Sequence, residues 1–418
     1  MFERRIPEWL RHAPHPSVKG FATLAGFEAV TRGMLISVFP VALYDAFQDA
    51  ALISSIYFVV GLLSLSTGLL IPFLNRWIPR RWLYSIGALL YILGSCLATT
   101  GTAELLVAGL VLNTMATVVT FVCFNAYVLD FIERVELGKS ETLRMFYSAA
   151  GWAVGPVLGV SLWSWSREVP FLISAAAAVV MLCAFLYMRL GNGRIITRAK
   201  RPAPNPLAFL GRFFQQPRLI AGWLFAVIRS CGWWAYVVYL PIFAVENGLG
   251  EKLGGSLLSV TNAGLFLSPL MLRWMQRHSV RHSVRTGFLA CSCLFLAAGL
   301  LSLLPWVTVG LLFCGSFFLI MLDNCAGLPF LMAVKPSERT EMSAIYSSFR
   351  DVSGILTPGI AWLVLLVTPI SGIFVVSGLA SLIAWRIAGG LHPRLGAKRL
   401  VEVPDPKPAS PLSPQASA

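Results

Sequence analysis

Two opposite charges lie inside an apolar stretch near the start of the chain. The segment "GFEAVTRGML" (26–35) carries Glu28 and Arg32. Residues four apart share one face of a helix, so these two side chains can pair. A lone charge near the bilayer centre costs about 2.5–3.5 kcal/mol on insertion scales, and a partner lowers that cost. The spacing therefore predicts an internal ion pair in a membrane-spanning helix.

Other charges recur inside later apolar stretches. Arg229 has no acid three or four residues away, so its partner must come from another helix, and Asp323 and Asp351 are the candidates. Arginine stays protonated in such a setting, so only an acid can release a proton. We expect the arginines to hold an anion and an acid to carry a proton. The candidate substrate and proton-coupling residues are Glu28, Arg32, Asn125, Arg229, Asp323, Asn324, Arg350 and Asp351.

A second interpretation of the same charges stays open. They can be fixed ion pairs that join parts of the protein, without a role in binding. Asp130 and Glu133, at the end of one apolar stretch, are expected at the membrane interface.

Composition identifies the elements that must position these side chains. The chain has 418 residues, of which 57% are hydrophobic and 12% charged, and its mean hydropathy is +0.74. Soluble domains average roughly 25% charged residues. Apolar runs long enough to cross a bilayer recur about twelve times, which predicts an all-α membrane protein. They lie near 21–44, 51–73, 82–101, 104–131, 143–165, 169–190, 218–243, 253–275, 285–304, 307–334, 341–368 and 370–390.

The net charge of +14 does not indicate nucleic acid as a partner. Lysine and arginine cluster at the N-terminus and in every second loop, which is the positive-inside pattern of membrane proteins. We therefore expect both termini to be cytoplasmic, in a plasma (inner) membrane, with the bilayer as the partner of the basic loops.

An internal repeat organises the chain. A shift of 197 residues places Arg32 on Arg229 and "RWIPRR" (76–81) on "RWMQRH" (273–278), and a shift of 199 places Gly155 on Gly354. Parallel repeats of this kind place a substrate site at their interface near the bilayer midplane. The expected organisation is a cytoplasmic segment 1–20, a six-helix bundle 21–190, a linker 191–217, a second six-helix bundle 218–390 and a disordered cytoplasmic tail 391–418.

Over nearly its whole length the chain resembles the major facilitator superfamily (MFS). The layout of six plus six spans, the basic turn after span two and "GWAVGPVLG" (151–159) carry the resemblance. The last segment is similar to the G-x-x-x-G-P-x-x-G motif of the family's exporter and antiporter branches. The resemblance implies two pseudo-symmetric bundles, alternating access and a monomer. The motif and gating residues that it assigns are Asn75, Arg76, Arg80, Arg81, Gly151, Gly155, Pro156 and Gly159.

Two features depart from the family pattern. Asn75 stands where the family has an acid before the basic turn, and Ile78 and Pro79 stand where it has a glycine. Span four lacks the arginine that proton-drug antiporters of the family usually carry. The resemblance therefore covers the superfamily better than it covers that subgroup.

Aromatic side chains are further candidates for lining a cavity. Span seven contains "CGWWAYVVYLP", and the repeat pairs a tyrosine of span five with one of span eleven. An aromatic wall with a few polar points suits an amphipathic solute, and it suits lipid contact equally well. The candidates are Tyr147, Trp233, Trp234, Tyr236 and Tyr346.

The sequence predicts a transporter and no enzyme. It has no phosphate-binding Gly-Lys loop, no nucleophile elbow and no His/Cys cluster with metal-ligand spacing, so no catalytic residue, metal or cofactor is expected. The expected function is proton-coupled export of a small amphipathic or anionic organic compound. Import of an anionic metabolite, lipid transport and a non-transporting membrane scaffold on the same fold remain alternatives.

The charge pattern makes a topological prediction. A cysteine introduced at Gly193, in a background without the native cysteines, should react with a membrane-impermeant thiol reagent only after the inner membrane is permeabilised. Labelling of this variant in intact cells would reverse the predicted orientation.

Overall fold

The computed structural model describes residues 18–132, 137–188, 210–334, 342 and 345–392, and contains no strand in these ranges. The expected segments 1–20, 191–217 and 391–418 lie mostly outside the described residues. The N-terminal group of helices comprises α2 (Val18–Leu35), α3 (Val38–Phe47), α4 (Ala50–Trp77), α5 (Arg80–Ala98), α6 (Ala103–Phe131), α7 (Leu137–Trp165) and α8 (Val169–Tyr187).

The C-terminal group begins with a short helix, α9 (Leu210–Phe214), that lies within the range expected as a linker. It continues with α10 (Pro217–Trp234), the π-helix η2 (Ala235–Tyr239), α11 (Leu240–Glu246), α12 (Lys252–Ala263), the 3₁₀-helix η3 (Gly264–Leu267), α13 (Ser268–Arg277), α14 (Val280–Leu300), α15 (Pro305–Cys325), α16 (Leu328–Ala333), α18 (Phe349–Leu365) and α19 (Ser371–Ala388).

Ten helical segments of the described chain are long and apolar enough to span a membrane. The other two predicted spans do not form one continuous helix of that length. The span near 253–275 is divided into α12, η3 and α13, and the span near 341–368 is described as a helix of 17 residues, α18. The all-α, multi-pass membrane fold predicted from the sequence is confirmed.

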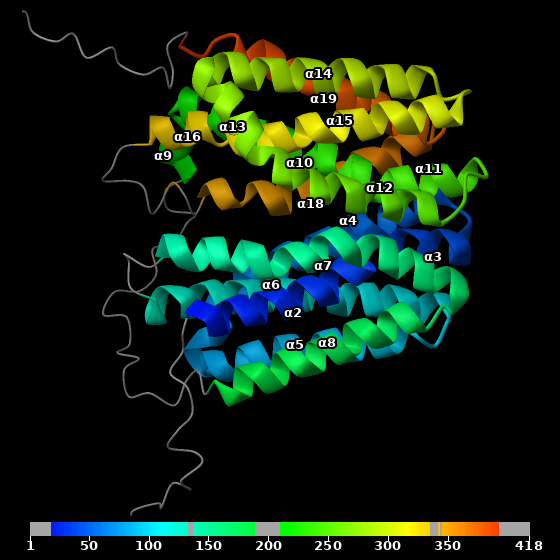
Figure 1. The fold of residues 1–418 in the computed structure, drawn as a ribbon, viewed down its shortest axis with the longest axis vertical. Coiled ribbons are helices and arrows are strands. Elements are labelled where there is room, and N and C mark those ends of the chain that lie inside the picture. The colour runs from blue at the N-terminus through cyan, green and yellow to red at the C-terminus, as the bar shows by residue number, and fades with distance from the viewer. Residues whose placement is uncertain (1–17, 133–136, 189–209, 335–341, 343–344, 393–418) are drawn as a thin grey trace, which may run out of the picture.

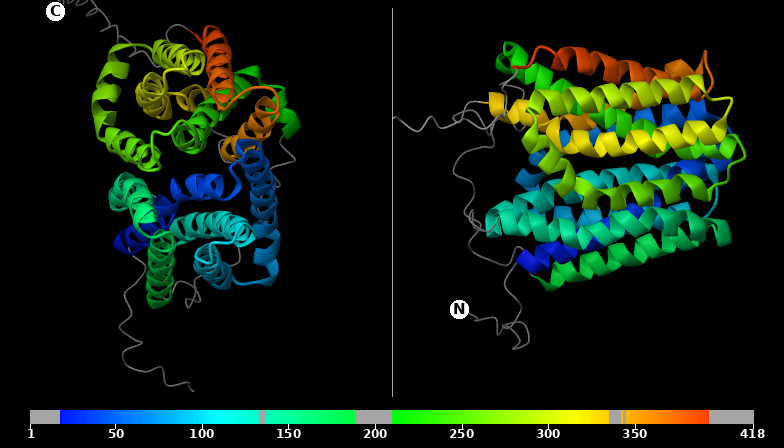
Figure 2. Two further views of the ribbon diagram at one scale, coloured as in Figure 1. Left: turned by 90° about the vertical axis from the view of Figure 1, so that its right-hand side faces the viewer. Right: turned by 45° about the horizontal axis from the view of Figure 1, so that its top comes forward.

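The two groups of helices lie side by side, as Figure 1 shows, with the N-terminal group below and the C-terminal group above. They meet along two seams, one between α4 and α18 and the other between α7 and α12. The end-on view in Figure 2 shows these seams on opposite sides of the molecule. The central region is therefore enclosed by helices of both groups.

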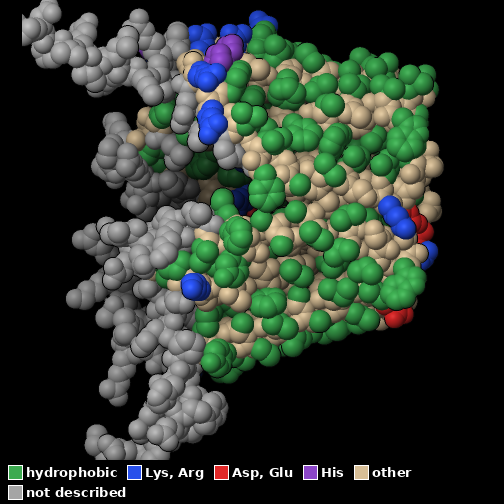
Figure 3. Space-filling view, viewed as in Figure 1, with side chains coloured by type: hydrophobic (Ala, Val, Ile, Leu, Met, Phe, Trp, Pro, Cys, Tyr) green, Lys and Arg blue, Asp and Glu red, His purple; other side chains and the backbone are tan. Residues whose placement is uncertain are grey.

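The surface is apolar except at its two ends. Figure 3 shows hydrophobic side chains over the length of the helices, with lysine and arginine gathered at the left edge, and acids together with a few basic side chains at the right edge. We call these ends the basic side and the acidic side. Helix α2 begins and α19 ends at the basic side, whereas the turns α3–α4 and α11–α12 lie at the acidic side. An apolar belt between two polar ends is the surface of a membrane-embedded protein.

Glycines in α7 bring this helix close to α2. A Cβ on Gly155 would lie 2.6 Å from the carbonyl carbon of Gly33, and one on Gly151 would lie 2.7 Å from that of Ala29. Gly159 meets the backbone of Met34 in the same way. Small residues at these positions permit the backbone contact that holds helices together in a membrane.

We predict that Gly155→Leu separates α2 from α7. Overpacking a close contact costs about 1–3 kcal/mol or more, so the purified variant should unfold several degrees below the wild type while still inserting into the membrane. Gly310→Leu is the matched control, because a Cβ at Gly310 meets nothing within 4 Å. Equal thermal stability of the two leucine variants would contradict this account of the glycines.

Candidate functional site

The partner of Arg229 is an acid of α15. Its Nε lies 3.0 Å from Oδ1 of Asp323, although the N–H is not aligned for a hydrogen bond. The indole Nε1 of Trp233 donates to Oδ2 of the same carboxylate at 3.0 Å. The arginine side chain is 11% exposed and the aspartate 37% exposed. Of the two acids that the sequence offered, Asp323 forms the pair and Asp351 does not.

The pair predicted within α2 is present in the N-terminal group. Nη1 of Arg32 donates to Oε1 of Glu28 at 3.3 Å. The guanidinium of Arg32 also lies over the ring of Trp152 on α7, 5.2 Å from its centroid. The glutamate is 12% exposed and the arginine 35% exposed, so the acid is the more deeply enclosed member.

Arg350 connects the charges of the two groups. Its guanidinium lies over Phe121 of α6 at 5.2 Å and over Phe349 of α18 at 5.7 Å, and Arg229 lies over the same Phe349 ring at 5.2 Å. Arg32 and Arg229 both act electrostatically on Arg350. The arginines of span one, span seven and span eleven thus gather in the centre of the molecule.

Arg350 differs from the other two arginines of this cluster. Arg32 and Arg229 each form an ion pair with a carboxylate, whereas Arg350 forms no ion pair with any residue that the structure describes. Asp351 attracts Arg350 electrostatically without pairing with it, and Arg144 of α7 also acts on it. The ring faces beside Arg350 stabilise a cation by only about 0.5–2 kcal/mol. We therefore regard the cluster as suited to an anion.

A hollow gives access to the centre. Figure 3 shows it between the two groups of helices, open toward the basic side, with a basic side chain visible inside. Intramembrane charged residues usually face such a cavity rather than lipid.

The remaining polar candidates lie on the same helices. Asn125 is partly exposed on α6, one turn beyond Phe121. Asn324 follows Asp323 and donates to the carbonyl of Ile320 at 3.2 Å. Asp351 is partly exposed in the first turn of α18.

The aromatic candidates do not share one environment. Trp233 binds the Asp323 carboxylate, as described. Tyr236 is buried, and its hydroxyl is paired with Thr261 of α12 at 2.8 Å, so it packs within the C-terminal group and does not line the hollow.

The other three aromatic candidates have separate neighbours. Trp234 contacts Tyr57 of α4 edge-to-face at 6.0 Å. Tyr346 stacks on Phe330 at 4.3 Å, and Tyr147 is 40% exposed.

The residues assigned to the basic turn lie at the basic side, away from the arginine cluster. Asn75 is exposed near the end of α4, and the side chain of Arg76 lies outside the described residues. Arg80 lies over the ring of Tyr127 at 5.4 Å and Arg81 over Trp82 at 5.5 Å.

Pro156 creates the polar contact between α7 and α12. Proline has no N–H, so the carbonyl of Trp152 loses its helical partner. Nδ2 of Asn262 donates to this carbonyl at 2.6 Å. The next backbone N–H, of Val157, donates to Oγ of Ser259 at 2.9 Å. Two backbone groups at the proline are therefore satisfied by side chains of the opposite group of helices.

The seam between α4 and α18 also includes a helix with an internal proline. Pro358 leaves the carbonyl of Gly354 without its helical donor, and Gly61 of α4 approaches this carbonyl so closely that a Cβ would lie 2.5 Å from it. The hydroxyl of Tyr239 donates to Oγ of Ser54 on α4 at 3.0 Å.

Both seams thus join the two groups toward the acidic side, while the hollow opens toward the basic side. Sequence reasoning identified Pro156 but missed Ser259, Asn262 and Arg144. For Ser259 and Asn262 the only available signal was the free carbonyl that a helical proline creates, and this signal does not identify the residue that binds the carbonyl. Among the described residues, no group of three or more His, Cys, Asp or Glu side chains could hold a metal ion.

The fold and the enclosed charges define a multi-pass membrane transporter. A family model described as Major Facilitator Superfamily matches residues 21–358, and the chain belongs to that superfamily. No protein with a curated description matches the sequence.

Three solved transporter structures show the same fold. A point mutant of the nucleoside transporter NupG is similar with a TM-score of 0.70 and 14% identity, over 89% of this chain and 99% of that chain. A POT family transporter in complex with a thioalcohol-conjugated peptide gives a TM-score of 0.69 and 12% identity, over 88% and 94%. A bacterial homologue of the iron transporter ferroportin in an inward-facing state gives 0.63 and 16%, over 88% and 97%.

The proline contact generates a prediction about Asn262. Replacing it by alanine leaves the Trp152 carbonyl without a donor, and a net hydrogen bond contributes about 0.5–1.5 kcal/mol, so the seam should open roughly two- to tenfold more often. The reporter is a cysteine that replaces Val160, a residue buried beside Gly255 in this seam. Its labelling by a water-soluble thiol reagent should accelerate by that factor.

Asn247→Ala is the control for this experiment, because within the described residues that side chain, at the end of α11, bonds to the Phe243 carbonyl of the same helix and not across the seam. Equal labelling rates in the Asn262 and Asn247 variants would show that the contact does not hold the seam.

Proposed function

We propose that the protein is a secondary transporter that exports a small amphipathic or anionic organic compound in exchange for protons, by alternating access. The supporting observation is that Arg350 forms no ion pair within the described residues, although it lies in a cluster built by both groups of helices. We further propose that the basic side faces the cytoplasm of a plasma membrane, because lysine and arginine gather there.

The cluster favours an anion with an apolar body. Arg350 is held by rings and not by a carboxylate of the described chain, so an incoming carboxylate or phosphate can take that place. Phe121, Phe349 and Trp152 supply flat apolar surface beside the guanidinium groups. Contacts of both kinds around one cavity match an amphipathic organic anion.

Protons can compete with this anion through the two paired acids. When Glu28 binds a proton, it ceases to neutralise Arg32, and the arginine can hold the solute instead. A proton on Asp323 would free Arg229 in the same way, because these two side chains form an ion pair. Glu28 also lies within electrostatic range of the buried Tyr84 and Tyr91 of α5. These pairings support the proposed exchange of solute for protons.

Alternating access supplies the remaining step. The hollow is open at the basic side, and the seams α4–α18 and α7–α12 close the acidic side. Release on the far side requires these seams to part while the basic side closes. In each cycle the Trp152 carbonyl and the Val157 N–H then leave Asn262 and Ser259 and take other hydrogen-bond partners.

A binding screen tests the proposed solute class. Aromatic and alkyl carboxylates should raise the unfolding temperature of the purified protein, whereas their methyl esters should not, because only the anion can pair with Arg350. Arg229→Gln should weaken the binding of the best anion on the order of tenfold or more. Arg218→Gln is the control on the same helix, since Arg218 is exposed near the start of α10.

Transport of that anion tests the coupling. In proteoliposomes, a pH gradient should drive uptake by the wild type, and Glu28→Gln should remove the dependence on pH while leaving anion binding measurable. Glu104→Gln, which removes an exposed acid at the acidic side, should behave as the wild type. Unchanged rates and pH profiles in both Arg229→Gln and Glu28→Gln would show that the charges are structural.

A further inference from the structure

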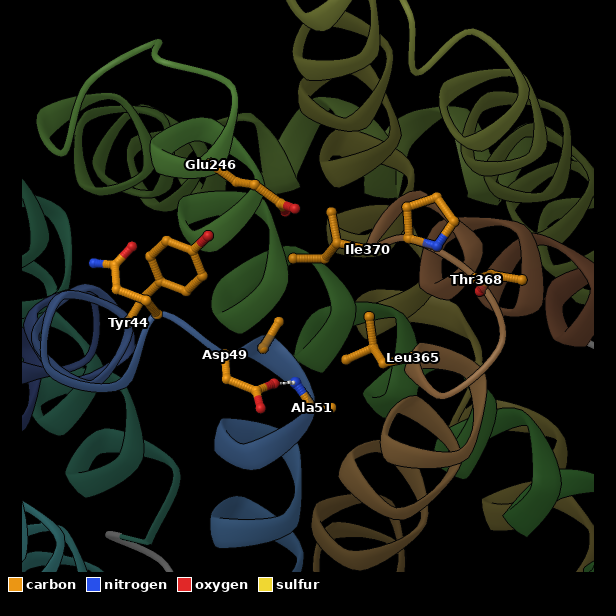
Figure 4. A pocket seen from close by; sticks show the side chains of 10 residues that line it. Tyr44, Asp49, Ala51, Glu246, Leu365, Thr368 and Ile370 are labelled. Atoms are coloured by element: carbon orange, nitrogen blue, oxygen red, sulfur yellow. Dashed lines mark hydrogen bonds between the residues drawn. The ribbon is translucent and has the colours of Figure 1, made fainter.

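A cavity at the acidic side lies between the two groups of helices. It has a volume of about 350 Å³ and is separate from the arginine cluster. The N-terminal group contributes the end of α3 and the start of α4, and the C-terminal group contributes Glu246 of α11 and the turn between α18 and α19 (Figure 4). The polar residues that line it are Tyr44, Gln48, Asp49, Glu246 and Thr368.

The carboxylates of this cavity have no cation. Neither Asp49 nor Glu246 forms an ion pair with a described residue, whereas nearby Asp45 is paired with Arg167 at 2.8 Å. Asp49 uses Oδ1 to accept from the backbone N–H groups of Ala51 and Leu52, which leaves Oδ2 available. Two negative charges therefore remain around one cavity.

Two side chains of the cavity donate hydrogen bonds to backbone carbonyls. Nε2 of Gln48 donates to the carbonyl of Asp45 at 3.3 Å, and the hydroxyl of Thr368 donates to that of Val364 at 2.9 Å. Their oxygens still have acceptor capacity. The cavity consequently offers several acceptors and few donors, so its complement is a cation rich in N–H groups.

Tyr44 provides an independent indication of a ligand. Its side chain is only 8% exposed, yet its hydroxyl forms no hydrogen bond with the described part of the chain. Figure 4 shows this hydroxyl pointing into the cavity, toward Glu246. The hydroxyl oxygen itself is accessible from the cavity, so a bound molecule can donate a hydrogen bond to it.

We propose that this cavity binds a primary ammonium group from the outer solution. The ammonium is held between the carboxylates of Asp49 and Glu246, and one of its N–H groups donates to the Tyr44 hydroxyl. Three N–H donors on one cation match the free acceptors. Leu365 and Ile370 provide apolar contact for a short alkyl stem. A bare metal ion fits less well, because the described residues contain no cluster of three acidic, His or Cys ligands.

The cation also stabilises the closed acidic side. Its two carboxylates come from different groups of helices, so they separate when the seams part, and a ligand that needs both favours the closed arrangement. This consequence rests on the proposed alternating access, whereas binding itself does not.

The test uses n-butylammonium chloride with the purified full chain. We expect a saturable rise in unfolding temperature, and no such rise with tetraethylammonium chloride at equal ionic strength, because that cation has no N–H donor. Glu246→Gln and Asp49→Asn should each weaken the apparent affinity about three- to tenfold, and asparagine retains the cap of α4. Tyr44→Phe keeps the packing and should weaken binding as well.

Glu104→Gln is the control, since it removes an acid of the same side that does not line the cavity. An equal response to tetraethylammonium, no saturable response to butylammonium, or unchanged affinity in both Glu246→Gln and Tyr44→Phe would overturn the site. Butylammonium should also slow the labelling of Val160→Cys. Binding without slower labelling would refute the stabilisation of the closed side and leave the transport assays above as a separate question.

Discussion

A polar group buried in a membrane must find its partner within the protein, because lipid offers none. This constraint places the arginines against carboxylates and ring faces, and it places Asn262 and Ser259 against the backbone at Pro156. The same requirement therefore governs the centre of the molecule and the seam that closes it. Several of these partners, such as Asp323 for Arg229 and Asn262 for the carbonyl at Pro156, come from another helix, so satisfying these groups also fixes how the helices are arranged.

The constraint explains how a stable fold can still move. The apolar contacts along the helices are similar in kind to contacts with lipid, so they impose little preference between arrangements. The polar contacts at the seams are few and specific, and in the proposed cycle their exchange changes which side is closed. The glycines of α7 have the opposite role, since Gly151, Gly155 and Gly159 pack on α2 within one group and keep that group rigid. One face of α7 is thus fixed and the other is exchangeable.

The sequence predicts the helices and local pairs better than contacts between helices. The spacing of Glu28 and Arg32 is enough to predict their pair, because both lie on one helix. Arg229 needed a partner from elsewhere, and the sequence left Asp323 and Asp351 equally possible, since only packing decides which helix lies opposite. Asn262 had no distinguishing feature, because its importance depends on a carbonyl in another helix. The break of span eight at η3 was missed as well, since apolar composition does not report local helix type.

The central claim is that the charged cluster and the seams at the acidic side are coupled. Spin labels at Ser164 and Lys252, which line one cavity from opposite groups of helices, report the separation of the seam directly. The account predicts two distances between the labels in the wild type, of which the shorter one matches the arrangement described. The ratio of the two populations should change across a pH series. Glu28→Gln should hold this ratio constant. A single distance at every pH, in the wild type and the variant alike, would contradict the account.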